Sequence, residues 1–245
     1  MNRLKGILRR IPLLPDLFRW LRRLSFQVRL GKKDCEQVFS AIYRKNYWGG
    51  WDSFSGTGSD VLQTELIVRE LPGVFVELSV LTMLDIPCGD FHWMSGVELG
   101  SVDYTGADIV KELTEQNRKL YERQGLRFLS LDLIRDGLPR VDLVFCRDCL
   151  VHFSFKDIVL ALKNICRSRS SYLLTTTFPE RNKNHDIVTG QWRPLNLELP
   201  PFELPAPLKI IREGCTEGQG DYADKSMALW SIADIRNALR ERFPE

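Results

Sequence analysis

Short apolar runs alternate with amphipathic stretches from residue 82 onward, and this alternation restricts the chain to few folds. Apolar residues recur at helical spacing over 110–124 and 155–166. Alternation of this kind predicts an α/β fold, in which helices cover both faces of a mostly parallel sheet. The strand-like runs are TMLDI (82–86), VDYTGAD (102–108), LRFLSL (126–131), VDLVFC (141–146), SYLLTTTF (171–178), LKIIRE (208–213) and MALWSI (227–232).

The stretch LDIPCGDFHWM (84–94) joins the first strand to a sharp polar turn. In an open parallel sheet, ligands bind beyond the carboxyl ends of the strands, where this turn is expected. A dinucleotide site needs G-x-G-x-x-G, so that the backbone can approach a pyrophosphate at a helix N-terminus. Here these positions hold Pro87, Gly89 and either Phe91 or His92. One glycine alone would serve a pyrophosphate poorly.

A carboxylate stands at the end of each of the first three predicted strands: Asp85, Asp108 and Asp132. S-adenosylmethionine has no phosphate, and its ribose, adenine and cationic groups all suit carboxylates. Asp108 follows Asp85 by 23 residues, close to the spacing at which an acid grips a ribose diol. Asp132 can accept from an adenine amine between Leu131 and Leu133. The alternative is that each acid only caps the start of a helix.

Four motifs give the chain a resemblance to the class I S-adenosylmethionine-dependent methyltransferases, within a bacterial group often linked to surface-glycan genes. They are DIPCGDF, CRDCLVHF, LLTTTF and GQWRPLNLELPPF, and the resemblance extends from YWGGWDSFSGTGS to KSMALW. It implies a Rossmann-like, seven-stranded sheet whose last strand is antiparallel. The chain departs from the general superfamily loop at Pro87 and Phe91, where glycine is commoner. The resemblance implies cofactor contacts at Asp85, Gly89, Asp108 and Asp132. The further candidate contacts are Pro87, Phe91, Ile109, Leu133 and Arg147. Arg147 would reach the cofactor's carboxylate or position a helix.

The CRDCLVHF segment (146–153) is expected beside the reactive methyl group. Methyl transfer to a hydroxyl requires alignment of the acceptor and removal of a proton. His152 is the candidate base, and Asp148 or Asp186 would orient it or bind substrate. Alternatively, His152 is a residue at a helix start that is hydrogen-bonded in place. A metal clamp from His185, Asp186 and a strand-end acid is a weaker hypothesis, and no metal is expected.

Residues 179–207 contain six prolines and little periodicity, so they are expected to form a substrate-side insertion. Their polar groups and Trp192 suit a carbohydrate acceptor. The glycine- and serine-rich segment 49–59, flanked by Trp48 and containing Trp51, is predicted to close as a lid, or else is a surface loop. A helix is predicted from Ser59 or Asp60 to about Glu70.

The charge distribution is uneven. Residues 1–33 carry ten basic residues and one acid, a net charge of +9, against −7 for the remainder. Apolar and basic residues over 7–30 follow roughly helical spacing, so the segment would lie on an anionic membrane or pack on its own domain. Nucleic acid is not expected, because no groove-reading motif is present. With no apparent signal peptide or spanning segment, the expected location is the cytoplasm, either free or peripheral at the inner membrane face.

Cys146 and Cys149 form a lone C-x-x-C, which is either a redox or metal site or a pair of half-buried thiols at a strand end. A zinc site usually needs four ligands, so the second reading is favoured.

The sequence predicts three parts: a basic amphipathic extension (1–33), a helix and loop cap over the cofactor site (34–81) and a methyltransferase domain (82–245). The expected function is S-adenosylmethionine-dependent methyl transfer to a hydroxyl of a glycan or lipid-linked glycan. Two alternatives remain open: a nucleotide-dependent oxidoreductase on a similar sheet, and a non-catalytic S-adenosylmethionine-binding protein.

Overall fold

The computed structural model describes residues 34–49 and 52–244. The chain divides into two compact units, Met1–Asp34 and Cys35–Glu245, of which the second is described below. The predicted amphipathic extension over 1–33 lies outside the described residues.

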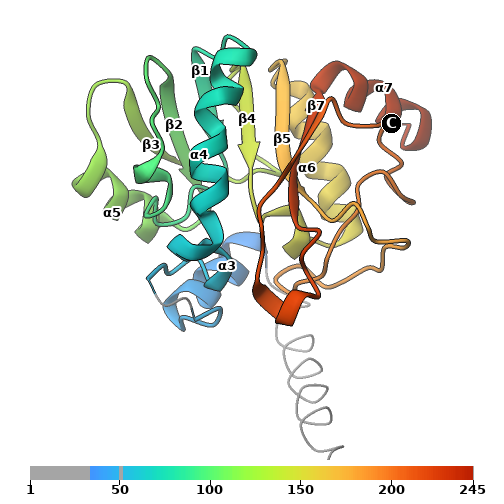
Figure 1. The fold of residues 1–245 in the computed structure, drawn as a ribbon, viewed down its shortest axis with the longest axis horizontal. Helices are drawn as coiled ribbons and strands as arrows, with labels where there is room; N and C mark the ends of the chain where they lie inside the picture. The colour runs from blue at the N-terminus through green and yellow to red at the C-terminus, as the bar shows by residue number, and fades with distance from the viewer. Residues whose placement is uncertain (1–33, 50–51, 245) are drawn as a thin grey trace, which may run out of the picture. The chain divides into compact units, whose positions relative to one another are not determined.

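A seven-stranded sheet in the order β3-β2-β1-β4-β5-β7-β6 forms the centre of the second unit (Figure 1). β7 pairs antiparallel with β5 and β6, while the pairs among β1 to β5 are all parallel. The Rossmann-like sheet with an antiparallel last strand is therefore confirmed. The strands are β1 (Thr82–Asp85), β2 (Asp103–Asp108), β3 (Leu126–Ser130), β4 (Leu143–Cys146), β5 (Tyr172–Thr177), β6 (Lys209–Arg212) and β7 (Ser226–Ser231).

Helices cover both faces of the sheet because successive strand residues point to opposite sides. In β1, Met83 packs in a cluster with Ile67 and Leu71 of α4, while Leu84 packs in a second cluster with Ile158 of α6. The buried side chains of α7 belong to this second cluster, together with Leu84 and Ile158. The helices are α3 (Cys35–Arg44), α4 (Val61–Glu77), α5 (Lys111–Tyr121), α6 (Phe155–Arg167) and α7 (Ile232–Arg242).

The helix that follows Asp60 is longer than predicted. α4 continues past Glu70 and through Pro72 to Glu77. Its apolar stripe explains this, since Val74 and Phe75 extend the buried face begun by Ile67 and Leu71. Asp60 precedes the helix, although its side chain makes no capping hydrogen bond.

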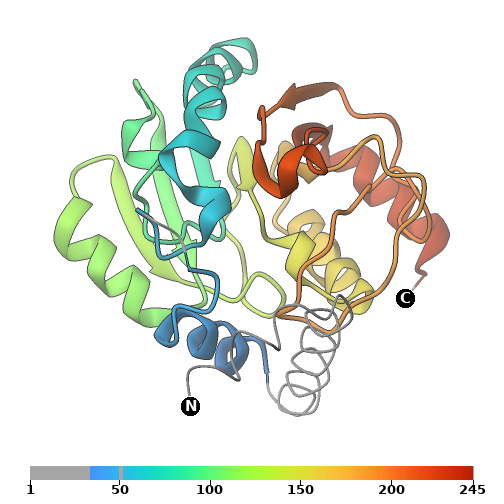
Figure 2. The same ribbon diagram turned by 60° about the horizontal axis from the view of Figure 1, so that its bottom comes forward.

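The irregular segment 179–207 lies on the α6 and α7 side of the sheet (Figure 2). It contains no helix or strand, yet Leu195, Leu197 and Phe202 are fully buried in the same cluster as α6 and α7. The Phe178 amide also donates to the Leu195 carbonyl at 2.8 Å. These contacts give the segment a defined structure without regular elements. Over the described ranges, no helix is both long enough and apolar enough to cross a bilayer.

Candidate active site

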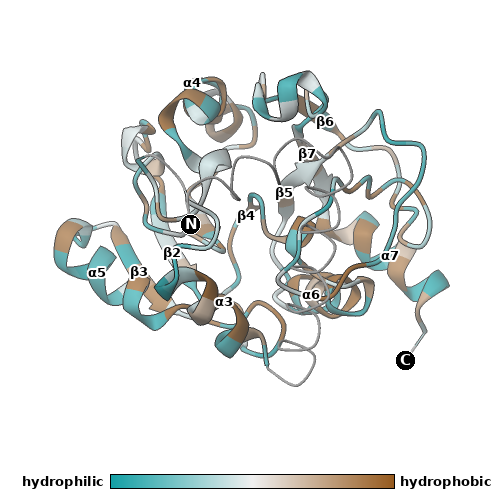
Figure 3. Cartoon of the chain, turned by 90° about the horizontal axis from the view of Figure 1, so that it is seen from below, coloured by the Kyte–Doolittle hydropathy of each residue, from teal (hydrophilic) through white to brown (hydrophobic). Residues whose placement is uncertain are grey.

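A cavity opens at the carboxyl edge of the sheet, beside the point between β1 and β4 where the strand order reverses. Figure 3 looks onto this edge, with α3, α4 and α6 around the ends of β4 and β5. Reversal points are where open α/β sheets bind ligands. The free volume is about 110 Å³. Ten predicted site residues line the cavity: Asp85, Pro87, Gly89, Asp108, Ile109, Asp132, Leu133, Arg147, Asp148 and His152.

Asp85 ends β1 beneath the glycine turn, and it is only 2% exposed. The Tyr104 hydroxyl donates to its Oδ2 at 2.5 Å. Burial raises the pKa of Asp85 to about 8, although the hydrogen bond from Tyr104 opposes the shift. At neutral pH the protonated form of this carboxyl is therefore favoured.

Asp108 ends β2 and fixes the turn that follows β1. Its Oδ2 accepts from the Gly89 amide at 3.1 Å, and its Oδ1 accepts from the Val110 amide at 2.9 Å. Burial raises its pKa to about 6, and these backbone donors oppose the shift. Gly89 has a φ of +54°, and a Cβ there would lie 2.2 Å from Ser55 Oγ. The position therefore needs glycine for both its backbone conformation and its close contact.

Asp132 follows β3 and shares the cavity wall with Leu133. Its Oδ1 accepts from the Ile134 amide at 2.8 Å, so the carboxylate also caps the turn that it begins. The structure therefore brings all three strand-end carboxylates to one cavity, while the capping alternative describes part of what Asp108 and Asp132 do.

Phe91 is the predicted cofactor contact that does not line the cavity. Its φ is +59°, and its buried ring packs against Tyr104, Tyr121 and Phe128 at centroid distances of 5.0–5.2 Å. The side chain belongs to the apolar core beneath the turn. We therefore remove Phe91 from the candidate contacts.

Arg147 is the centre of a buried ionic network that sequence reasoning missed. Its Nε and Nη2 donate to both carboxylate oxygens of Glu213 at 2.8 and 2.9 Å. Nη2 also donates to the Gly58 carbonyl at 2.8 Å. The Lys225 ammonium lies 3.3 Å from Glu213 Oε2. Arg147 thus holds the loop before α4 against β6 and β7, which agrees with its predicted positioning role.

Asp148 belongs to the same network. Its Oδ2 accepts from Lys225 Nζ at 2.6 Å and lies 3.3 Å from Arg147 Nη1. Burial opposes ionisation of Asp148, but these two cations outweigh it and hold its pKa below the ordinary value. The described hydrogen bonds include none between Asp148 and His152. The prediction that Asp148 orients the imidazole by direct contact therefore has no support in this geometry.

His152 is oriented by the insertion and by Trp48. A carbonyl only accepts, so the 2.9 Å contact with the Gln191 carbonyl requires Nδ1 to donate, which leaves the Nε2 lone pair free in the neutral ring. The Trp48 ring stacks on the imidazole at 4.4 Å. Burial lowers the pKa of His152 to about 4. The ring is therefore neutral at pH 7, as a proton acceptor must be.

The loop that precedes α4 forms one wall of the cavity through Trp48, Phe54 and Ser55. The Asp90 carboxylate accepts from Ser53 Oγ at 3.0 Å and from the Phe54 amide at 2.8 Å. Of the predicted lid over 49–59, Ser53 and Phe54 are thus bonded to the turn after β1. Residues 50 and 51 lie outside the described part.

Neither a metal site nor a disulfide is found in the described part of the chain. The carboxylate of Asp186 instead accepts from the Phe155 amide at 2.7 Å and so serves the start of α6. Cys146 and Cys149 are fully buried rather than half-buried. A contact with Cys146 and burial both raise the pKa of Cys149, which disfavours the thiolate that redox or metal chemistry needs.

Comparison with known proteins identifies the fold. No protein-family model and no curated protein sequence matches the chain. Among solved structures, human N-acetylserotonin methyltransferase in complex with SAM is 14% identical, with a TM-score of 0.56 over 83% of this chain and 61% of that one. This chain thus spans less than two thirds of the human enzyme.

Two other structures agree. Burkholderia thailandensis 1,6-didemethyltoxoflavin-N1-methyltransferase with S-adenosylhomocysteine is 15% identical, with a TM-score of 0.55 over 81% of this chain and 91% of that one. PigF with SAH is 14% identical, with a TM-score of 0.61 over 94% of this chain and 72% of that one. The chain therefore has the Rossmann-like fold that these methyltransferases share.

Proposed function

We propose that the chain is an S-adenosylmethionine-dependent methyltransferase that acts on a hydroxyl of a glycan or lipid-linked glycan. The observation that carries the proposal is the convergence of Asp85, Asp108 and Asp132 on one cavity at the reversal point of the sheet. The similar structures support it, because three of them contain SAM or S-adenosylhomocysteine.

The chain that follows β1 favours S-adenosylmethionine over a dinucleotide. A pyrophosphate is normally held at the N-terminus of a helix that begins at this turn. Between β1 and β2 this chain has only η3 (Met94–Gly96), a single 3-10 turn of three residues. Acidic groups line the cavity where a diphosphate would need donors. The oxidoreductase alternative is therefore disfavoured.

The donor set suits the proposed cofactor. Asp108 would accept from the ribose hydroxyls and Asp132 from the adenine amine, while Asp85 would support the turn at Gly89 beside the cationic groups. S-adenosylmethionine, when bound, supplies an electrophilic methyl group on sulfur. His152 would accept the proton of the attacking hydroxyl at Nε2.

The free volume of about 110 Å³ is below the roughly 300–1,000 Å³ of small-molecule sites. Ser55 lies against Gly89 and Phe54 also lines the cavity, so residues 52–59 are expected to move when the cofactor enters. This extends the lid hypothesis to a defined set of contacts.

A polar acceptor is favoured by the insertion, which surrounds His152 with backbone groups. The Gly190 amide donates to the His152 carbonyl at 2.8 Å, and the Gln191 carbonyl accepts from the ring. His152 and Trp48 both line the cavity, and a hydrogen-bonding ring nitrogen beside an aromatic side chain suits a hydroxyl-bearing ring.

The proposal is tested by incubating the protein with methyl-tritiated S-adenosylmethionine and a cell extract, followed by separation into carbohydrate, protein and small-molecule fractions. We expect label in carbohydrate that survives mild alkali, because methyl ethers resist base whereas methyl esters release methanol. Label confined to protein, or released by alkali, would contradict methylation of a glycan hydroxyl. Absence of transfer despite S-adenosylmethionine binding would favour the non-catalytic alternative.

We also propose that the basic extension over 1–33 contacts an anionic membrane. Its net charge of +9 supports this. The full chain should pellet with vesicles of equimolar phosphatidylglycerol and phosphatidylcholine. Replacement of Arg19, Arg22 and Arg23 by Gln should reduce the pelleted fraction, and equal pelleting would contradict the proposal.

A further inference from the structure

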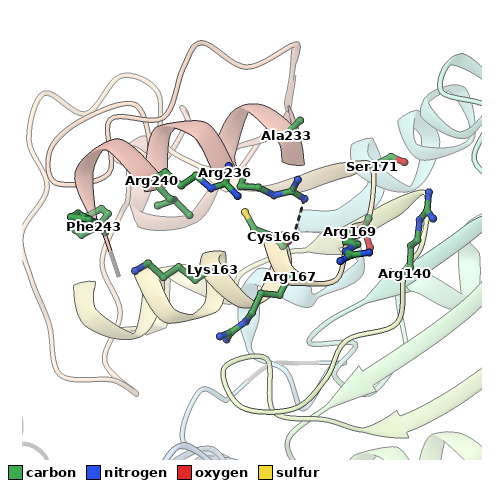
Figure 4. A pocket seen from close by; sticks show the side chains of 13 residues that line it. Arg140, Lys163, Cys166, Arg167, Arg169, Ser171, Ala233, Arg236, Arg240 and Phe243 are labelled. Carbon is green, nitrogen blue, oxygen red and sulfur yellow. Dashed lines mark hydrogen bonds between the residues drawn. The ribbon is translucent and has the colours of Figure 1, made fainter.

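A second cavity lies at the amino edge of the sheet, between α6 and α7 and beside the turns that enter β4 and β5 (Figure 4). Its volume is about 980 Å³. Its lining includes five arginines and one lysine, with no carboxylate side chain. These cationic residues are Arg140, Lys163, Arg167, Arg169, Arg236 and Arg240.

The cations are arranged in rows along the two helices. Lys163 and Arg167 are one turn apart on α6, as are Arg236 and Arg240 on α7. Like charges at this spacing destabilise a helix slightly. Over the described ranges, none of the six cationic side chains lining this cavity forms an ion pair with a carboxylate. Among the residues that the structure describes, no carboxylate therefore neutralises the positive charge of this cavity.

Helix stability explains only part of this pattern. Cations in the last turn of a helix interact favourably with the C-terminal carbonyls, which accounts for Arg167 and Arg240. Arg236 donates to the Cys166 carbonyl at 3.0 Å, so it also joins the two helices. Arg140 and Arg169 lie on exposed turns outside both helices, and neither role applies to them.

We propose that this cavity binds a small soluble molecule that carries two or more phosphate groups. Guanidinium groups present paired donors that match phosphate oxygens, and such charge-assisted hydrogen bonds are strong. The charges line a concavity near the upper size of small-molecule sites, roughly 1,000 Å³, rather than a flat surface. Leu239 and Phe243 give one end an apolar wall for an organic group.

This site is separate from the proposed active site, because the two cavities lie at opposite ends of the parallel strands. Strands of four to six residues put about 13–20 Å between the two edges. Failure of either proposal therefore leaves the other unaffected.

The test is calorimetric titration of the full-length protein with inorganic tripolyphosphate. The cavity variant combines Arg140→Gln, Arg169→Gln and Arg240→Gln. These three residues are exposed, and in the described part of the chain their side chains have no hydrogen-bond or ion-pair partner. We expect its affinity to fall by about tenfold or more, because three charge-assisted contacts are removed. The control variant combines Arg69→Gln, Lys119→Gln and Lys156→Gln, which remove the same charge from exposed sites outside both cavities. Its affinity should stay within about twofold of the wild type.

Matching circular dichroism spectra and unfolding midpoints would show that both variants fold. Equal losses in the two variants, or no loss in either, would overturn the proposal, since binding would then follow overall charge. Vesicles of equimolar phosphatidylglycerol and phosphatidylcholine, and a single-stranded oligonucleotide, form two further arms. Cavity-dependent binding to either of these without binding of tripolyphosphate would also overturn it.

Discussion

Asp85 is a carboxyl group whose surroundings favour the protonated form. It is buried, and the Tyr104 hydroxyl at 2.5 Å opposes the cost of its charge only in part. The pKa of Asp85 is about 8 in the folded chain, against 3.8 for an unperturbed carboxyl. Protonation of Asp85 therefore stabilises the folded chain relative to the unfolded chain.

The Asp85→Asn substitution should remove a pH dependence of stability. Between pH 3.8 and 8 the folded chain binds this proton more tightly than the unfolded chain, so the contribution of Asp85 is full at low pH and is lost as the pH rises to about 8. Between pH 6.5 and 8, we expect the unfolding free energy of the wild type, measured with urea, to fall by about 1.5 kcal/mol more than that of Asp85→Asn. His152 is present in both proteins, so its titration cancels in the comparison. Parallel stability curves for the two proteins would contradict the assignment.

His152→Gln should abolish turnover without abolishing cofactor binding. Loss of a general base typically lowers kcat by about 10²- to 10⁴-fold. At saturating S-adenosylmethionine, where protonation of Asp108 near pH 6 does not limit cofactor binding, the wild-type kcat should fall as the pH decreases towards 4, the pKa of the His152 ring. The affinity for S-adenosylhomocysteine is measured as the control. A variant with wild-type kcat would exclude His152 as the base.

At the scale of elements, the 52–59 segment and the turn after β1 are held at the sheet edge by buried ion pairs and hydrogen bonds. The 52–59 segment is joined to the turn after β1 through Asp90 and to β4 through Arg147. Arg147 in turn reaches β6 and β7 through Glu213 and Lys225. The site is thus assembled from segments far apart in the sequence.

Asp90→Ala should loosen the 52–59 segment while the sheet remains intact. The Phe54 amide loses its acceptor, so its hydrogen exchange should accelerate in the variant. Mass spectrometry of peptides covering 52–59 provides the measurement, and Asp234→Ala, at an exposed position on α7, is the control. Unchanged exchange over 52–59 in Asp90→Ala would contradict the role of this carboxylate.

Glu213→Gln should be strongly destabilising, because it leaves Arg147 and Lys225 buried with one carboxylate fewer. Breaking a buried ion pair typically costs about 3–5 kcal/mol. The matched control is Glu180→Gln, whose exposed pair with Arg212 should contribute about 0–1 kcal/mol. Equal unfolding free energies for the two variants would refute the importance of the network.

At the scale of the whole molecule, the strands and the residues at their carboxyl ends could be predicted because they follow from local patterns. Parallel strands bring their carboxyl ends to one edge, so Asp85, Asp108 and Asp132 were expected there before their contacts were known. The continuation of α4 through Pro72 was missed, because tertiary packing of Val74 and Phe75 outweighs the local signal to stop.

Contacts that depend on side-chain direction or on late strands could not be predicted. Phe91 lies in the expected turn, but its positive φ directs the ring into the core. Glu213 and Lys225 flank β6 and β7, and no spacing in the sequence links them to Arg147. Only the order of β5, β7 and β6 brings the three together.

The central claim is that the carboxylates at the sheet edge hold an adenosine-bearing sulfonium compound. Calorimetry of the full chain with S-adenosylmethionine, S-adenosylhomocysteine and NAD tests it most directly. We predict that the first two bind and NAD does not, and that Asp108→Asn weakens S-adenosylhomocysteine by about tenfold or more, because a charged acceptor is lost from the ribose. Binding of NAD alone, or wild-type affinity in Asp108→Asn, would contradict the account.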